Sequence, residues 1–311
     1  MGGLISYYEE GFILASILST IRDLYGAVKR SVVCLWRGNG VSTISHVFNL
    51  INILLCLVDV FLFDLAVNIA DNYYDYLHGK DRHFLTDINP IGRLKLPLTD
   101  VRNLVWISYF ISAIPGIILV YRTGWPVLIM GIVGYFIGIF YIAGPKPLNA
   151  TPICELVVSF FISYFIILVS IYVTIYGVYP LTWNLALTTV IRCLPLTLIF
   201  YALQLANNTC DLHEDLNNGR HTLASYTGKK NALKIIKALI IAGLLFPIAV
   251  VLFGLAKWPL IFSCFLLPIL WPKLKQFFEH PDKQTTYLQM IKYLSIFFIT
   301  YIAIYTVLVL V

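Results

Sequence analysis

The segment 153–177, ICELVVSFFISYFIILVSIYVTIYG, contains one charged residue among 25. A helix needs about 20 predominantly apolar residues to cross the hydrocarbon core of a bilayer. Within that core the backbone must satisfy its own hydrogen bonds, which only helices and closed β-barrels do. A membrane β-barrel would alternate apolar and polar residues, and this segment does not. It therefore predicts a transmembrane α-helix.

The composition of the whole chain agrees with this segment. Of its 311 residues, 59% are hydrophobic and 12% are charged, and the mean hydropathy is +0.82. Soluble domains carry about 25% charged residues, so the composition excludes a soluble globular enzyme, a disordered chain and a secreted disulfide scaffold. The six cysteines form no CxxC pair or metal-binding spacing and are interpreted as small hydrophobic residues. We expect an all-α, polytopic membrane protein.

Further apolar runs give the number of spans. Six of them fall at 47–67, 104–122, 125–143, 181–205, 234–255 and 287–311. The run 258–272 is shorter, and 11–35 is weaker because Arg22 and Asp23 interrupt it. With 153–177 this makes a bundle of about nine transmembrane helices. No linker divides the chain, so we expect residues 1–311 to form a single domain.

The positions of the basic residues predict the orientation. Lysine and arginine gather in the loops after the second, sixth and eighth spans, around Lys80, Arg220 and Lys275. Cytoplasmic loops carry such an excess, so these even-numbered loops are expected in the cytoplasm. The net charge of +6 is then explained by membrane topology, and we expect no nucleic-acid partner.

Acidic residues gather in two short windows at the cytoplasmic ends of the second and sixth spans. The windows are 63–81, FDLAVNIADNYYDYLHGKD, and 204–223, QLANNTCDLHEDLNNGRHTL. In both, oxygen-bearing side chains step by four, three and four residues, which keeps them on one face of a helix. The two columns are Asp64, Asn68, Asp71 and Asp75, and Gln204, Asn208, Asp211 and Asp215. The matching spacing suggests an internal repeat whose columns face each other.

Clustered carboxylates repel one another unless protons or cations neutralise them. Hard cations such as Mg²⁺ prefer carboxylate and amide oxygens and commonly bridge to substrate phosphates. The windows therefore predict a site for a magnesium-bound diphosphate. Basic side chains on the same side of the membrane are candidates to hold that diphosphate, although each is equally explained as a cytoplasmic loop charge: Arg93, Lys95, Lys146 and Arg220.

These windows resemble the UbiA superfamily of intramembrane aromatic prenyltransferases. The patterns are N-x-x-D-x-x-x-D in the first window and N-x-x-x-D-x-x-x-D in the second, after the second and sixth of nine helices. Three stretches are most similar to the 1,4-dihydroxy-2-naphthoate polyprenyltransferase branch, the MenA type. They are NYYDYLHGKD (72–81), YIAGPKPLNATPICEL (141–156) and NNTCDLHEDLNNGRHTL (207–223).

The resemblance implies transfer of a polyprenyl chain from polyprenyl diphosphate to an aromatic acceptor. In this branch the implied acceptor is 1,4-dihydroxy-2-naphthoate, in menaquinone biosynthesis. It implies an enzyme of the bacterial cytoplasmic membrane, with Mg²⁺ as cofactor and its active site facing the cytoplasm. The implied metal ligands are Asn68, Asp71, Asp75, Asn208, Asp211 and Asp215, the four aspartates being catalytic. The substrate-binding candidates also include Asn68, Asn72, Asn207 and Asn208. Tyr141 is a catalytic candidate whose ring would stabilise an allylic cation.

Three alternatives stay open at this point. Another aromatic acceptor, such as 4-hydroxybenzoate, would suit the same motifs. A cation transporter would use the acidic columns as its ion pathway, although that role predicts acids near the middle of the bilayer. The windows would otherwise be two solvated acidic loops, which does not account for their matching spacing.

Overall fold

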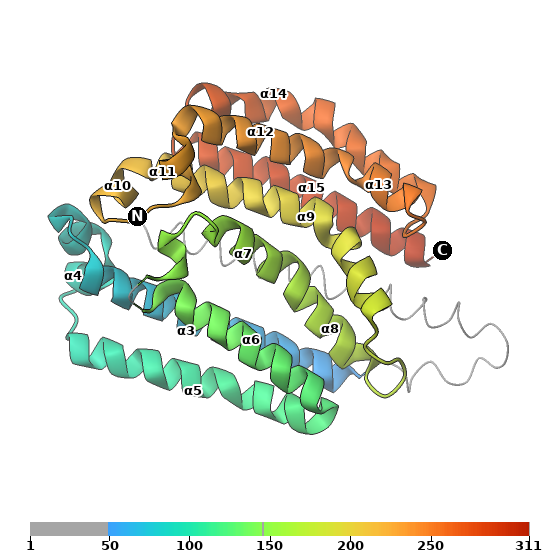
Figure 1. Cartoon of the computed structure of the whole chain (residues 1–311), viewed down its shortest axis with the longest axis horizontal. Coiled ribbons are helices and arrows are strands. Elements are labelled where there is room, and N and C mark those ends of the chain that lie inside the picture. Colours follow the sequence, from blue (N-terminus) through green and yellow to red (C-terminus); the bar gives the residue numbers. More distant parts are fainter. Residues whose placement is uncertain (1–48, 145, 311) are drawn as a thin grey trace. The chain divides into compact units, whose positions relative to one another are not determined.

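The computed structural model describes residues 49–144 and 146–310, and in these ranges it contains helices and no strands. The α-helices, with π and 3₁₀ segments labelled η, are α3 (Leu50–His78), η2 (Phe84–Ile88), α4 (Pro90–Arg93), α5 (Leu98–Thr123), α6 (Trp125–Ile142), η3 (Leu148–Ala150), α7 (Cys154–Phe160), η4 (Phe161–Phe165), α8 (Ile166–Ile175), α9 (Trp183–Cys210), α10 (Leu212–Asn217), α11 (Leu223–Thr227), α12 (Lys229–Leu245), α13 (Pro247–Leu252), η5 (Trp258–Phe265), α14 (Leu266–Glu279) and α15 (Thr286–Leu310). The all-α prediction is confirmed (Figure 1).

Eight helical segments in the described ranges are long and apolar enough to cross a membrane. They are Leu50–His78, Leu98–Thr123, Trp125–Ile142, Cys154–Ile175, Trp183–Cys210, Lys229–Leu252, Trp258–Glu279 and Thr286–Leu308. In chain order they match the eight spans expected from 47–67 to 287–311, which confirms them. The remaining expected span, 11–35, lies outside the described residues.

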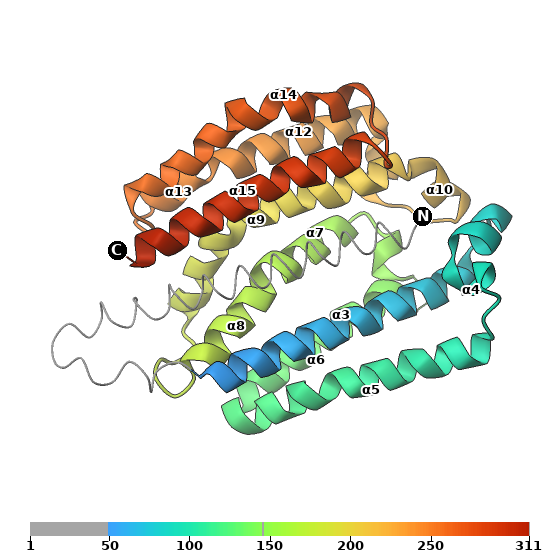
Figure 2. The same cartoon turned by 180° about the vertical axis from the view of Figure 1, so that it is seen from behind.

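The chain divides into two compact units. The first contains Leu50–Cys154 and His213–Thr222, and the second contains Glu155–Leu212 and the chain from Leu223 onward. Within the first, α3 packs against α5 and α6. Within the second, α9 packs against α12 and α15, and α14 packs against α12 and α15, as both views show (Figures 1 and 2). That residues 1–311 act as one domain stays a prediction.

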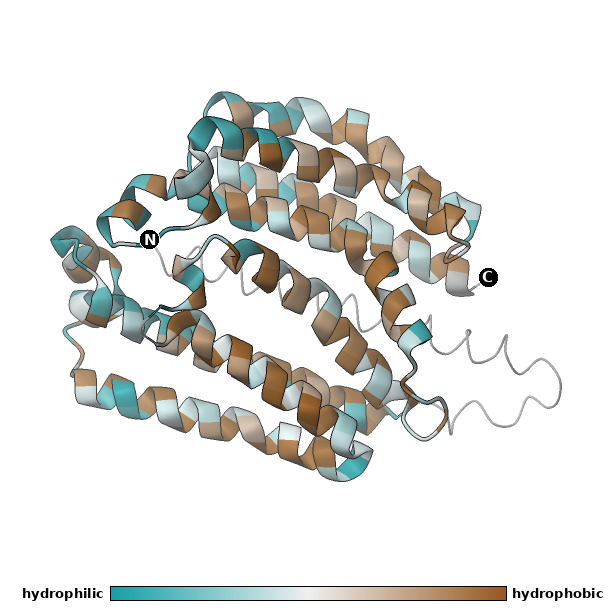
Figure 3. Cartoon of the chain, in the orientation of Figure 1, coloured by the Kyte–Doolittle hydropathy of each residue, from teal (hydrophilic) through white to brown (hydrophobic). Residues whose placement is uncertain are grey.

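The outer surface of α5 is suited to lipid. Its exposed side chains recur every three or four residues and are Trp106, Phe110, Ile114, Ile117 and Tyr121, which is 91% exposed. This spacing places them on one helical face. A contiguous apolar face of this length is rare in soluble monomers but expected where a helix meets acyl chains. Hydrophobic residues dominate the long helices, whereas hydrophilic residues gather around α10 (Figure 3).

Small residues allow the helices of each unit to approach closely, as is common in membrane proteins. On α3, Ala66 and Ala70 are fully buried. A Cβ atom at Gly138 of α6 would lie 2.4 Å from the ring of Phe63 on α3. In the second unit, a Cβ atom at Gly243 of α12 would lie 2.8 Å from Ile199 on α9. These contacts fix the long helices from which the acidic motifs project.

Gly92 in α4 offers a test of the packing that follows α3. A Cβ atom there would lie 1.8 Å from the backbone oxygen of Leu85 and 3.1 Å from the ring of Tyr76. Because backbone cannot give way as a flexible side chain can, we expect Gly92→Ala to lower the melting temperature of the detergent-purified protein by several degrees. Gly131→Ala in α6 is the matched control, since in the described part of the chain no atom beyond its own turn of helix lies within 4 Å of its Cβ position. Equal melting temperatures for the two variants would contradict this packing.

Candidate active site

The first acidic motif lies on one continuous helix of the first unit, as its spacing predicts. Helix α3 carries Asp64, Asn68, Asp71 and Asp75. The amide nitrogen of Asn68 donates to the backbone oxygen of Asp64 at 3.0 Å and to its carboxylate at 3.3 Å. The amide of Asn72 donates to the backbone oxygen of Asn68 at 2.9 Å. The two asparagines are thus anchored along the same helix as the carboxylates.

The second motif is divided between two helices, so the prediction of one helical face is wrong beyond Cys210. Helix α9 carries Gln204, Asn207 and Asn208 and ends at Cys210. Asp211 caps α9, and Asp215 lies in the first turn of the short helix α10. Carboxylates are unfavourable at the C-terminus of a helix and favourable at its N-terminus, which explains why the helix breaks at Asp211 and starts again before Glu214.

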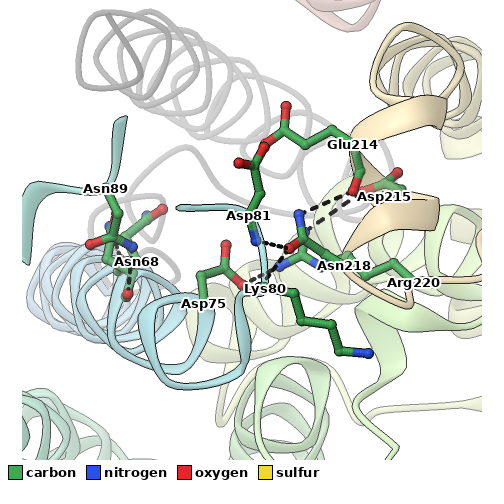
Figure 4. A network of polar contacts seen from close by, with 10 residues as sticks. Asn68, Asp75, Lys80, Asp81, Asn89, Glu214, Asp215, Asn218 and Arg220 are labelled. Atoms are coloured by element: carbon green, nitrogen blue, oxygen red, sulfur yellow. Dashed lines mark hydrogen bonds and ion pairs between the residues drawn. The ribbon is translucent and has the colours of Figure 1, made fainter. Parts of the chain in front are cut away.

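Arg220 joins the first motif to the second within the first unit. Its Nη2 forms an ion pair with Asp75 Oδ1, and its Nη1 lies 3.9 Å from Asp215 Oδ1 (Figure 4). Asp215 is buried, at 7% exposure. Burial alone would lower the pKa of Arg220, but Asp75, Asp71 and Asp215 more than offset it, and the pKa is raised. The guanidinium stays charged among three motif carboxylates.

Asn218 fixes the loop that carries Arg220 against the loop after α3. Its Oδ1 accepts from the backbone nitrogen of Lys80 at 2.9 Å and from that of Asp81 at 3.4 Å (Figure 4). Its own amide donates to the backbone oxygen of Glu214 at 3.0 Å. These two hydrogen bonds join residues that are 138 and 137 positions apart in the sequence, and so hold the two loops together. The motif spacing did not identify Asn218.

Asn89 is a second residue that the sequence did not single out. It is 2% exposed, and its amide donates to the backbone oxygen of Asn72 at 2.9 Å. Its Oδ1 accepts from the backbone nitrogen of Ile91 at 2.9 Å and so caps α4. The Asn-Pro pair at 89–90 is a typical start of a helix, which is the signal that could have identified it.

The other basic candidates lie differently from Arg220. Arg93, Lys95 and Lys146 are exposed. In the described part of the chain, none of them forms an ion pair with a motif carboxylate. Of the four basic residues considered, the structure brings Arg220 to the motifs.

Tyr141 lies in a cluster of aromatic residues within the first unit. It packs beside Ala70 of α3 and Ile142 of α6, together with Tyr73, Tyr74 and Tyr109. The rings of Tyr73 and Tyr74 meet edge to face at 5.3 Å. Aromatic faces therefore adjoin the helix segment that carries the first motif.

In the second unit, two motif side chains have partners that sequence reasoning missed. Asp211 forms an ion pair with Lys283, which follows α14. The amide of Asn208 donates to Glu155 Oε1 at 2.9 Å. Lys283 lies in the basic connection after the eighth expected span, whose charges are explained by membrane topology. Glu155 is the lone acid of an apolar span, which is itself a signal of function.

The oxygen donors of the first unit fit Mg²⁺. In the described ranges, no three His, Cys, Asp or Glu side chains form a ready metal cage. Mg²⁺ seldom uses such a cage, since it keeps several waters and is held by one or two carboxylates plus substrate phosphates. Asp71 and Asp75, one turn apart on α3, supply donors of this kind, and the carboxylates already gather around the cation of Arg220.

Comparison with known families identifies this architecture. Residues 33–302 match the UbiA prenyltransferase family. The chain belongs to this family. The match covers both acidic motifs and all of the described spans except the end of the last, and it confirms the resemblance in the sequence and the expectation of a prenyltransferase.

One relative of this UbiA family member is a 1,4-dihydroxy-2-naphthoate octaprenyltransferase from Bacillus subtilis (strain 168). The two are 28% identical over 203 residues, which are 65% of this chain and 63% of the relative. The chain thus matches a little less than two thirds of that relative's length.

Two solved structures show the same fold. A UbiA homologue from Aeropyrum pernix K1 in its apo form has a TM-score of 0.63 at 14% identity, covering 93% of this chain and 98% of that one. A UbiA homologue from Archaeoglobus fulgidus bound to DMAPP and Mg²⁺ has a TM-score of 0.56 at 13% identity, covering 97% and 98%. The UbiA-like fold is therefore confirmed.

Proposed function

We propose that this chain transfers a polyprenyl chain from polyprenyl diphosphate to an aromatic acceptor, with 1,4-dihydroxy-2-naphthoate of menaquinone biosynthesis as the first candidate. The observation that carries the proposal is the position of Arg220, which holds Asp75 of one acidic motif and Asp215 of the other. The guanidinium would bind the diphosphate, and the surrounding carboxylates would bind the Mg²⁺ ions that accompany it. The relative from Bacillus subtilis supports the choice of acceptor.

The motif residues provide the ligands for Mg²⁺ in this proposal. They are Asn68, Asp71 and Asp75 in the first unit, Asp215 in the same unit, and Asn208 and Asp211 in the second. When bound, Mg²⁺ neutralises the diphosphate and makes it a better leaving group. Support for Mg²⁺ comes from the donor chemistry and from the Archaeoglobus fulgidus homologue, whose structure contains DMAPP and Mg²⁺.

Arg220 acts on the leaving group. In the structure it is paired with the motif carboxylates of Asp75 and Asp215. We expect it to donate to diphosphate oxygens as the bond between the allylic carbon and oxygen breaks and the electron pair stays on oxygen. Arginine suits this role because its planar fork binds phosphate through two hydrogen bonds.

The aromatic residues act on the carbon side of the reaction. Bond cleavage leaves an allylic cation, which the faces of Tyr73, Tyr74 and Tyr141 stabilise by cation–π attraction. The acceptor ring forms the new carbon–carbon bond and, for 1,4-dihydroxy-2-naphthoate, loses carbon dioxide. The apolar packing around Ala70 and Ile142 keeps water from quenching the cation.

The basic loops support a cytoplasmic-facing site. The connections after α3, α9 and α14 carry the excess of lysine and arginine, and the proposed ligands lie at the ends of α3 and α9 that precede two of these connections. We therefore place the reaction at the cytoplasmic surface of a bacterial cell membrane.

Labelled prenyl diphosphate and a panel of acceptors test this function. In membranes containing the chain, we expect labelled product with 1,4-dihydroxy-2-naphthoate and none after EDTA treatment, with activity restored by excess MgCl₂. Product with 4-hydroxybenzoate instead would move the chain to another branch of the family. Cation flux into liposomes with no prenylated product from any acceptor would contradict the proposal.

A further inference from the structure

Glu155 is a buried carboxylate that the reaction described above does not use. It is 1% exposed and lies in the first turn of α7. Its Oε1 accepts from the amide of Asn208 at 2.9 Å. Its Oε2 is buried and forms no hydrogen bond within the described part of the chain. Placing an acid there is costly, and costly polar groups in membrane proteins are usually functional.

The contact with Glu155 dictates which way the amide of Asn208 faces. The amide nitrogen of Asn208 is the donor in this contact and Glu155 Oε1 is the acceptor. The nitrogen therefore faces Glu155, and the amide oxygen is turned away from it. Asn208 lies in the last turn of α9, three residues before Asp211, which caps that helix.

We propose that Glu155 is a positioning residue that holds the Asn208 amide with its oxygen presented as a ligand for Mg²⁺. This rests on the proposed function, since it names what fixes one of the proposed ligands. Without Glu155 the Asn208 amide is able to rotate by half a turn. Its NH₂ group would then face Mg²⁺ in place of its oxygen, and the cation repels that group. Partners that orient a ligand in this way typically change metal affinity by about 10- to 100-fold when removed.

Ser163 provides a matched control for a purely structural role. Its hydroxyl lies 2.7 Å from that of Thr197, so it too joins the α7–α8 span to α9 by a buried hydrogen bond in the same unit. Thr197 precedes Asn208 by eleven positions on α9. Ser163→Ala removes a helix-to-helix hydrogen bond while leaving Asn208 in place.

The experiment measures Mg²⁺ binding without turnover. The purified full chain in detergent is titrated with MgCl₂ at fixed inorganic pyrophosphate, and the rise in melting temperature gives the half-saturating Mg²⁺ concentration. We expect Glu155→Ala to raise that concentration about tenfold or more. Glu155→Gln retains an acceptor and should stay within about threefold of the parent protein. Ser163→Ala should lower the melting temperature but leave the half-saturating concentration unchanged.

Reversing the polarity of the hydrogen bond sharpens the test. Asn208→Asp alone places two carboxylates together and should weaken Mg²⁺ binding. Combined with Glu155→Gln, the glutamine donates to the new aspartate, which still presents an oxygen, so the double variant should recover most of the affinity. Such recovery depends on the orientation of the group at position 208 and not on the stability of the helix pair.

Three results would overturn the inference. They are an unchanged half-saturating concentration in Glu155→Ala, an equal change in Ser163→Ala, and no recovery in the double variant. If the proposed function itself were wrong, the results would differ from these three. The melting temperature of the parent protein would not rise with MgCl₂ and pyrophosphate, and the parent would show no prenyl transfer. That result would overturn both.

Discussion

Alanine at any one of the four motif aspartates should reduce prenyl transfer by about 100-fold or more. The variants are Asp71→Ala, Asp75→Ala, Asp211→Ala and Asp215→Ala. Each removes an oxygen donor proposed to hold Mg²⁺ against the diphosphate, so the leaving group keeps its negative charge and the barrier to ionisation rises. Turnover is measured in membranes with labelled prenyl diphosphate and excess MgCl₂.

The acidic control for this series is Asp100→Ala. Asp100 is exposed and lies in the first turn of α5, away from the motifs in sequence, and its loss should leave turnover within about twofold of the parent. Size-exclusion profiles of the detergent extracts show whether each variant is inserted and folded. If two of the four motif variants retained full turnover, the assignment of the metal ligands would be wrong.

Replacing Arg220 should produce the second largest effect. Arg220→Leu leaves Asp75 and Asp215 without the cation between them and removes the fork that would hold the diphosphate. We expect the KM for prenyl diphosphate to rise about 30-fold or more. Arg220→Lys keeps the charge but not the two-sided geometry, and its KM should fall between those of Arg220→Leu and the parent. Initial rates over a range of prenyl diphosphate concentrations give these values.

Arg93→Leu is the control for Arg220. Arg93 is exposed at the end of α4, and its charge is explained by membrane topology. Its removal should leave the KM unchanged. A larger KM effect at Arg93 than at Arg220 would show that the diphosphate binds elsewhere.

The sequence was sufficient for features that depend on neighbouring residues. An uninterrupted apolar run of about 20 residues forms a transmembrane α-helix in a bilayer, so eight spans could be predicted from the sequence. The first acidic column could also be predicted because α3 continues unbroken from Leu50 to His78. The second could not, since the break at Asp211 reflects the charge preferences of two helix ends and not the spacing of the motif.

Contacts between distant residues could not be predicted in this way. Asp75 and Arg220 are 145 positions apart, Asp211 and Lys283 are 72, and Glu155 and Asn208 are 53. Periodicity along a helix says nothing about which side chains meet across helices. In the sequence, Arg220 was equivalent to Arg93, Lys95 and Lys146, because the positive-inside rule explains all four. Packing distinguishes them.

A structure of the protein with Mg²⁺ and a non-hydrolysable prenyl thiodiphosphate tests the central claim most directly. We expect diphosphate oxygens hydrogen-bonded to the Arg220 guanidinium and Mg²⁺ held by motif carboxylates such as that of Asp75. The contrary result is a diphosphate bound elsewhere in the molecule, with Arg220 still paired to Asp75 and Asp215 as it is now.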